Sequence, residues 1–71
     1  MTELKISLAA ARVNANMTQE EVARHMRVSK NTVVNWEKGT SELKVSQADE
    51  LSKLYAIPLD YIFLPSTSTK S

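Results

Sequence analysis

Apolar residues recur every three or four positions along most of the chain, and no alternating apolar and polar stretch bounded by turn residues appears. This spacing is typical of short amphipathic helices. Glycine occurs once, at Gly39, and proline twice, at Pro58 and Pro65, so most breaks between helices must be polar turns. We therefore expect an all-α fold built from short helices.

Two capping signals mark the start of the first two helices. Ser7 is a suitable N-cap for a helix that runs to about Asn14. The sequence TQEE at 18–21 fits a capping box, in which the threonine hydroxyl and the last glutamate each accept from the other residue's backbone N–H. The second helix should begin there and end near Arg27. The residues expected on the inner faces of these helices are Leu8, Ala11, Ala15, Val22, Ala23 and Met26.

A third helix should follow almost at once. Ser29 offers its N-cap, and Gly39 suits the left-handed position that closes it. The intervening turn is too short for antiparallel packing, so the second and third helices should cross steeply, and a small residue such as Ala23 permits their close approach. The expected core of this helix pair is Val22, Ala23, Val28, Val33 and Trp36.

The remaining pattern predicts two more helices and a tail. Ser46 with Asp49 marks the expected start of the fourth helix, and Pro58 suits the opening of a short fifth helix that Pro65 ends. The small polar residues 66–71 predict a flexible tail behind a single domain at 1–65. The apolar residues expected in the last two helices are Ala48, Leu51, Leu54, Tyr55, Leu59, Ile62 and Phe63.

The composition argues against several kinds of site. The chain has no cysteine, and a single histidine, His25, cannot form a conventional zinc site. There is no glycine-rich phosphate loop, so we expect no enzyme, no metal, no cofactor and no small-molecule substrate. No apolar stretch approaches the roughly 20 residues of a membrane span, and no apolar signal core follows the first residues. These features predict a cytoplasmic protein with no membrane partner.

Basic charge is concentrated in the middle of the chain. The formal net charge is only +1, but residues 24–44 carry five basic and two acidic side chains, while the flanking segments are each −1. Such clustering is expected of a nucleic-acid-binding face, and an ordinary solvated helix surface accounts for it equally well.

The outer face of the third helix carries side chains that can read DNA bases. With Val33 and Trp36 inward, the outward residues are Lys30, Asn31, Val34, Asn35 and Lys38. Asparagine can bond adenine through two hydrogen bonds, lysine can donate to guanine, and an apolar group can contact the thymine methyl.

Together these segments resemble the lambda-repressor-like helix-turn-helix family (XRE type), which includes Cro and the phage repressors. The resemblance rests on TQEEVA at 18–23, VS at 28–29, Val33 and WEKG at 36–39, and it covers about Ser7 to Phe63. It implies a compact five-helix DNA-binding domain with the helix-turn-helix at the second and third helices. Two positions depart from the family pattern, because Arg27 stands where glycine is usual and Leu43 where proline is common. A left-handed Arg27 would carry about 1 kcal/mol of strain or more.

The resemblance also implies roles for individual residues. The base-reading positions fall on Lys30, Asn31 and Asn35. Arg12 is expected to pair with Glu37 and to direct its guanidinium partly at a phosphate, and the Arg27 side chain can add a phosphate contact. The other expected phosphate-binding residues are Gln19, Ser29, Lys38 and Thr40.

The implied function is a sequence-specific transcriptional regulator, a Cro-like repressor of phage, prophage or bacterial type, that inserts the third helix into the major groove of a double-stranded DNA operator. A homodimer would read two half-sites about 34–36 Å apart. The alternative is an antirepressor or antitoxin that uses the same fold to bind a partner repressor or toxin. The candidate dimer contacts, around the expected fifth helix, are Leu59, Tyr61, Ile62, Phe63 and Leu64.

Overall fold

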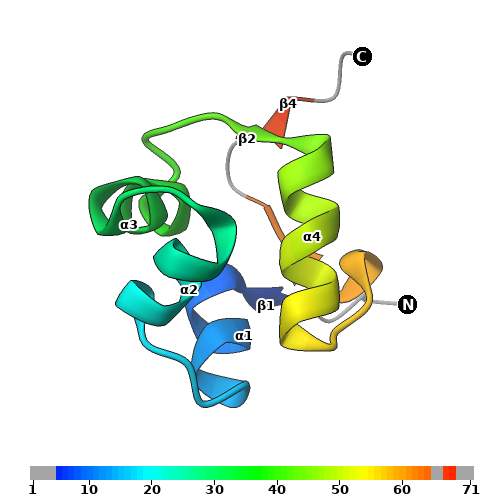
Figure 1. The fold of residues 1–71 in the computed structure, drawn as a ribbon. Coiled ribbons are helices and arrows are strands. Elements are labelled where there is room, and N and C mark those ends of the chain that lie inside the picture. The colour runs from blue at the N-terminus through cyan, green and yellow to red at the C-terminus, as the bar shows by residue number, and fades with distance from the viewer. Residues whose placement is uncertain (1–4, 65–66, 69–71) are drawn as a thin grey trace.

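The computed structural model describes residues 5–64 and 67–68. Within them the chain forms four α-helices, one 3-10 turn and four two-residue strands. In Figure 1, α2 and α3 lie on one side of the molecule and α4 on the other. The elements in chain order are β1 (Ile6–Ser7), α1 (Leu8–Asn14), α2 (Gln19–Met26), α3 (Lys30–Lys38), β2 (Leu43–Lys44), α4 (Val45–Tyr55), η1 (Leu59–Tyr61), β3 (Ile62–Phe63) and β4 (Thr67–Ser68).

The predicted starts of the first three helices are confirmed. The Ser7 hydroxyl accepts from the Ala10 N–H at 3.0 Å, which satisfies one of the unpaired amides of α1. At the start of α2 the Thr18 N–H donates to the Glu21 carboxylate at 2.8 Å, and the Glu21 N–H donates to the Thr18 hydroxyl at 3.1 Å. The Ser29 hydroxyl caps α3 by accepting from the Thr32 N–H at 3.2 Å.

All four helices end in the same way, through a left-handed residue. Behind α3 the Thr40 N–H donates to the Asn35 carbonyl at 3.0 Å and the Gly39 N–H to the Trp36 carbonyl at 3.2 Å, which is the Schellman pattern. Glycine holds the left-handed position only at Gly39, with φ 79°. The same pair of bonds closes the other three helices. The residues with positive φ there are Asn16, Arg27 and Ala56.

The start of the fourth helix differs from the prediction. The N-cap is Lys44, not Ser46, and its N–H donates to the Gln47 side-chain oxygen at 3.0 Å. Glutamine three residues after the N-cap thus satisfies the N-cap residue's own N–H, as the last residue of a capping box does. The N-cap therefore lies two residues before the expected Ser46, and the helix itself begins at Val45.

The prediction of a fifth α-helix is wrong, and the chain at this position is a 3-10 turn followed by a strand. The Tyr61 N–H donates to the Pro58 carbonyl at 2.9 Å, an i to i−3 bond, and Ile62 then turns extended with φ −109° and ψ 127°. Extended backbone alternates its side chains, so Ile62 is buried while Phe63 is exposed. The expected terminator, Pro65, lies outside the described residues.

Two short parallel strand pairs also correct the all-α expectation. β1 pairs with β3 in the register Ile6 to Ile62 and Ser7 to Phe63, so the start of the chain is joined to the segment after η1. β2 pairs with β4, the described part of the expected tail at 66–71, and the rest of that segment lies outside the described residues. The second pair is visible at the top of Figure 1.

One core joins all four helices. It contains residues from each helix and from β2 and β3, and Tyr55 is the polar-tipped member. Ala15, Met26, Val28 and Leu54 pack against it with partial exposure. No helix among the described residues is long and apolar enough to cross a bilayer. The fully buried residues are Leu8, Ala11, Val22, Ala23, Val33, Trp36, Leu43, Ala48, Leu51, Tyr55 and Ile62.

Candidate nucleic-acid interface

The outer face of α3 carries the side chains that were predicted to read bases. Lys30, Asn31 and Lys38 are exposed, and Val34 and Asn35 are half-buried. On the opposite face Val33 and Trp36 are 1% and 3% exposed. This face of the helix therefore carries two amides, one isopropyl group and two ammonium groups, and the buried opposite face holds it in place.

Close packing between α2 and α3 fixes the orientation of this face. Val22 and Ala23 of α2 are buried, and Val28 in the turn packs against the same cluster with partial exposure. The small Ala23 side chain lets the two helices approach. The Val28 N–H also donates to the Ala23 carbonyl at 2.9 Å, so the turn is tied to the end of α2 by backbone bonds.

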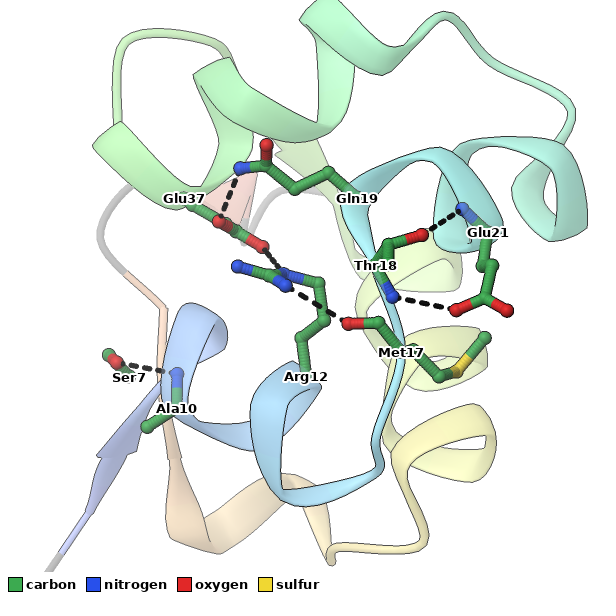
Figure 2. Close-up of polar contacts among 8 residues, drawn as sticks. All are labelled: Ser7, Ala10, Arg12, Met17, Thr18, Gln19, Glu21 and Glu37. Carbon is green, nitrogen blue, oxygen red and sulfur yellow. Dashed lines mark hydrogen bonds and ion pairs between the residues drawn. The ribbon is translucent and has the colours of Figure 1, made fainter.

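A polar network joins α1, α2 and α3 behind this helix pair (Figure 2). The Arg12 Nε donates to Glu37 Oε2 at 2.8 Å, and its Nη1 donates to the Met17 carbonyl at 3.0 Å. The Gln19 side-chain amide donates to Glu37 Oε1 at 3.0 Å. Both oxygens of the carboxylate are thereby satisfied, as a nearly buried charge requires.

The Arg12 and Glu37 side chains are 16% and 9% exposed, so their pair is a structural contact between helices. The guanidinium reaches the carboxylate and a loop carbonyl at the same time, which fixes α1, the loop before α2 and the last turn of α3 together. The pair that the family resemblance implied is therefore present in the structure. The expected contact of Arg12 with a phosphate stays a prediction.

The buried Tyr55 of α4 is coupled to this network electrostatically. Burial raises the pKa of Tyr55 to about 12, and the nearby Glu37 carboxylate adds to the rise while Arg12 opposes it. The tyrosine hydroxyl therefore stays protonated beside the carboxylate at all ordinary pH values. Helical spacing in the sequence predicted Tyr55 only as a residue of an apolar stripe, and this electrostatic link was not anticipated.

Gln19 has two tasks in this arrangement. Its side-chain amide is held by Glu37, and as the first residue of α2 its backbone N–H belongs to the unpaired group at the helix start. The side-chain nitrogen carries a second hydrogen that the bond to Glu37 does not use. The expected phosphate contact is compatible with both groups.

Asn35 and Thr40 are joined to each other at the end of α3. The Thr40 hydroxyl lies 3.2 Å from the Asn35 side-chain oxygen and 3.4 Å from its carbonyl oxygen. This contact orients the half-buried amide of Asn35. Asn31, by contrast, is exposed one turn earlier.

An ion pair at the exposed edge of the helix pair was not anticipated from the sequence. The Lys30 Nζ lies 3.1 Å from Glu20 Oε2, and the two side chains are 53% and 59% exposed. Hydrogen bonding to its own backbone N–H and to Lys30 lowers the pKa of Glu20. The two residues are ten positions apart, so only the steep crossing of α2 and α3 brings them together.

Arg27 is the left-handed residue between α2 and α3, with φ 61° and ψ 44°. The condition under which backbone strain was expected at this position is therefore met. Its side chain is exposed.

Among the described residues no group of three or more metal-binding side chains comes together.

Comparison with known proteins agrees with this architecture. The model of the family described as helix-turn-helix matches residues 8–62. The cryptic phage CTXphi transcriptional repressor RstR of Vibrio cholerae is 42% identical over 48 residues, which cover 68% of this chain and 43% of the relative. This chain thus aligns with less than half of that repressor.

A second relative aligns over most of both chains. An uncharacterised helix-turn-helix-type transcriptional regulator of Methanocaldococcus jannaschii is 30% identical over 61 residues, which cover 86% of this chain and 92% of the relative. No solved structure gives a significant match. The matched residues span α1 to η1 and include the crossed pair α2 and α3, and the chain belongs to the helix-turn-helix family.

Proposed function

We propose that the protein is a sequence-specific DNA-binding transcriptional regulator that places α3 in the major groove of an operator. The observation that carries the proposal is the outer face of α3, with exposed Lys30, Asn31 and Lys38 beside half-buried Val34 and Asn35. An α-helix fits the major groove, where these side-chain types can distinguish base pairs. The names of both relatives describe transcriptional regulators, one of them a phage repressor.

The supporting scaffold suits this task because base reading requires a helix held in one orientation. The buried side chains of Val33 and Trp36 anchor the inner face of α3 in the core. The ion pair between Arg12 and Glu37 fixes its last turn to α1. Phosphate contacts from Gln19, Ser29, Thr40 and Arg27 would then fix the register of the helix along the duplex. We propose a Cro-like repressor of phage or prophage type as the specific form.

The test is selection of bound duplexes from a random pool, followed by affinity measurements on the selected site and on a scrambled duplex at several salt concentrations. We expect a shared motif, a clear preference for the selected site, and a steep fall of affinity with salt because bound cations displace counterions from phosphates. A pool that yields no motif, with weak and salt-insensitive binding, would contradict the proposal and favour a protein partner such as a repressor or toxin.

We further propose that a homodimer reads two half-sites, with the region of η1 and β3 as its interface. Of the predicted contact residues, Ile62 is buried in the core and Leu59 and Leu64 are half-buried. Tyr61 and Phe63 remain 58% and 56% exposed, and Ile6 on the paired strand β1 is 37% exposed. Exposed aromatic residues grouped in this way are common at protein interfaces.

Sedimentation velocity tests the dimer by comparing the wild type with Phe63→Ser and Tyr61→Ser, both free and bound to the selected duplex. Exposed substitutions should leave the fold intact, which circular dichroism checks. We expect both variants to shift the population toward monomer and to weaken binding to a two-half-site duplex more than to a single half-site. Unchanged sedimentation of both variants would remove this region from the interface.

A further inference from the structure

The ion pair between Glu20 and Lys30 lies at the exposed edge of the helix-turn-helix. Glu20 is in the first turn of α2 and Lys30 is the first residue of α3, and their charged groups are 3.1 Å apart. Lys30 is also the first of the proposed base-reading residues. An acidic side chain beside a surface that must approach phosphates repels them and so weakens DNA binding. Its presence at this position therefore calls for a compensating role.

We propose that Glu20 is a specificity-determining residue that restrains Lys30, so that this lysine binds a base acceptor in the correct sequence but adds little attraction to DNA of any other sequence. The inference rests on the proposed function. Glu20 itself would contact no base. It is a positioning residue, and its effect on DNA binding would be transmitted through the Lys30 ammonium.

The chemistry of lysine explains why such a restraint would act unequally on the two kinds of DNA. An ammonium group has three N–H donors. In the operator, Lys30 can keep its bond to Glu20 and donate a second one to a guanine acceptor in the groove. On other sequences the available acceptor is a phosphate, and Glu20 both competes for the ammonium and repels that phosphate.

The ion pair is well suited to this role because it is weak and accessible. Both side chains are more than half exposed, and exposed pairs make small contributions that a good acceptor can replace. The Glu20 carboxylate is charged at physiological pH, and its hydrogen bonds lower its pKa further from the ordinary value. A second exposed pair, Lys53 with Asp49 at 3.3 Å, lies on α4 and provides a matched control.

The test is Glu20→Gln in the full chain, measured on the selected duplex and on a scrambled duplex across a range of salt concentrations. We expect affinity for the scrambled duplex to rise about two- to fivefold, the range that corresponds to an exposed ion pair. The salt slope on that duplex should steepen by about 0.9, the value for one more neutralised phosphate. Affinity for the selected duplex should change less, so the ratio of the two affinities should fall.

A double-mutant cycle with Lys30→Met identifies the route by which Glu20 acts. The effect of Glu20→Gln on the affinity ratio should disappear when Lys30 is replaced, and Asp49→Asn should leave the ratio unchanged. An equal rise on both duplexes, or an effect of the same size without Lys30, would overturn the inference and make Glu20 a source of general repulsion. If the wild type prefers no duplex, the proposed function fails and this inference fails with it.

Discussion

The Nε atom of Arg12 lies 2.8 Å from Oε2 of Glu37, so a residue of the first helix holds the last turn of α3. The contact spans 25 positions of sequence and is largely shielded from water. A charge in such a place is costly without a partner, and each member of the pair depends on the other. The orientation of the proposed DNA-reading helix is therefore coupled to α1, which would not itself enter the groove.

Replacing Arg12 by methionine should destabilise the fold, because Glu37 would keep only the Gln19 amide as a partner. We expect a loss of about 3 kcal/mol in the free energy of unfolding, the lower end of the range for a broken buried pair. Urea denaturation measures the change. The double variant with Glu37→Gln should recover part of the loss, since no uncompensated charge remains. If Arg12→Met and Glu37→Gln, each made alone, had unfolding free energies within a few tenths of a kcal/mol of the wild type, the pair would have no structural role.

The sequence predicted the features that depend on local chemistry. The helix starts at Ser7, Thr18 and Ser29 follow from side-chain oxygens that accept hydrogen bonds from nearby backbone N–H groups. A few neighbouring residues are enough to predict such a cap. The inward placement of Val33 and Trp36 follows from helical spacing alone. The resemblance to a known family, and not the residues alone, supplied the pairing of Arg12 with Glu37.

The features that were missed depend on contacts between distant segments. Ile62 is extended because it pairs beside Ile6, and no pattern near Ile62 indicates that pairing. The contact of Glu20 with Lys30 requires the crossing geometry of two helices. The left-handed end at Ala56 has no signal in its residue type, so only the backbone bonds of the folded chain reveal it, whereas asparagine at Asn16 is a residue that tolerates this conformation.

Replacing Arg27 by glycine should stabilise the fold and weaken DNA binding. Arg27 has φ 61°, where a Cβ atom is crowded, and removing that strain should outweigh the greater backbone entropy of unfolded glycine by about 1 kcal/mol. Thermal and urea unfolding measure the gain. The salt slope of DNA binding should become shallower as well, because an exposed cation near the groove is lost.

The control for this variant is Ala56→Gly, which relieves a left-handed alanine at φ 57° at the C-terminal end of α4. It should give a similar gain in stability with no change in DNA binding. If the two variants changed DNA affinity equally, the effect would come from stability and the phosphate role of Arg27 would be lost.

Stability should fall in alkaline solution as Tyr55 is forced to ionise. Its pKa is raised from 10.0 to about 12 in the folded protein, so the unfolded chain loses the proton first and stability declines as pH rises from 10 toward 12. The shift corresponds to roughly 3 kcal/mol at the upper end. Tyr55→Phe has no such proton, and the difference in unfolding free energy between the two proteins should change across this range. Parallel pH profiles would show that the hydroxyl is not shielded as described.

Asn31→Ala and Lys38→Ala should weaken DNA binding in different ways. Asn31 is exposed on α3 and lies outside the core, so its loss should lower the preference for the selected duplex by about 1–3 kcal/mol and leave scrambled DNA almost unaffected. Lys38 is proposed to contact phosphate, and its loss should weaken binding to both duplexes alike and make the salt slope shallower by about 0.9. Asn35→Ala is the less decisive variant, because the amide of Asn35 also contacts Thr40. Equal weakening of both duplexes by Asn31→Ala would mean that this face attracts DNA without reading its sequence.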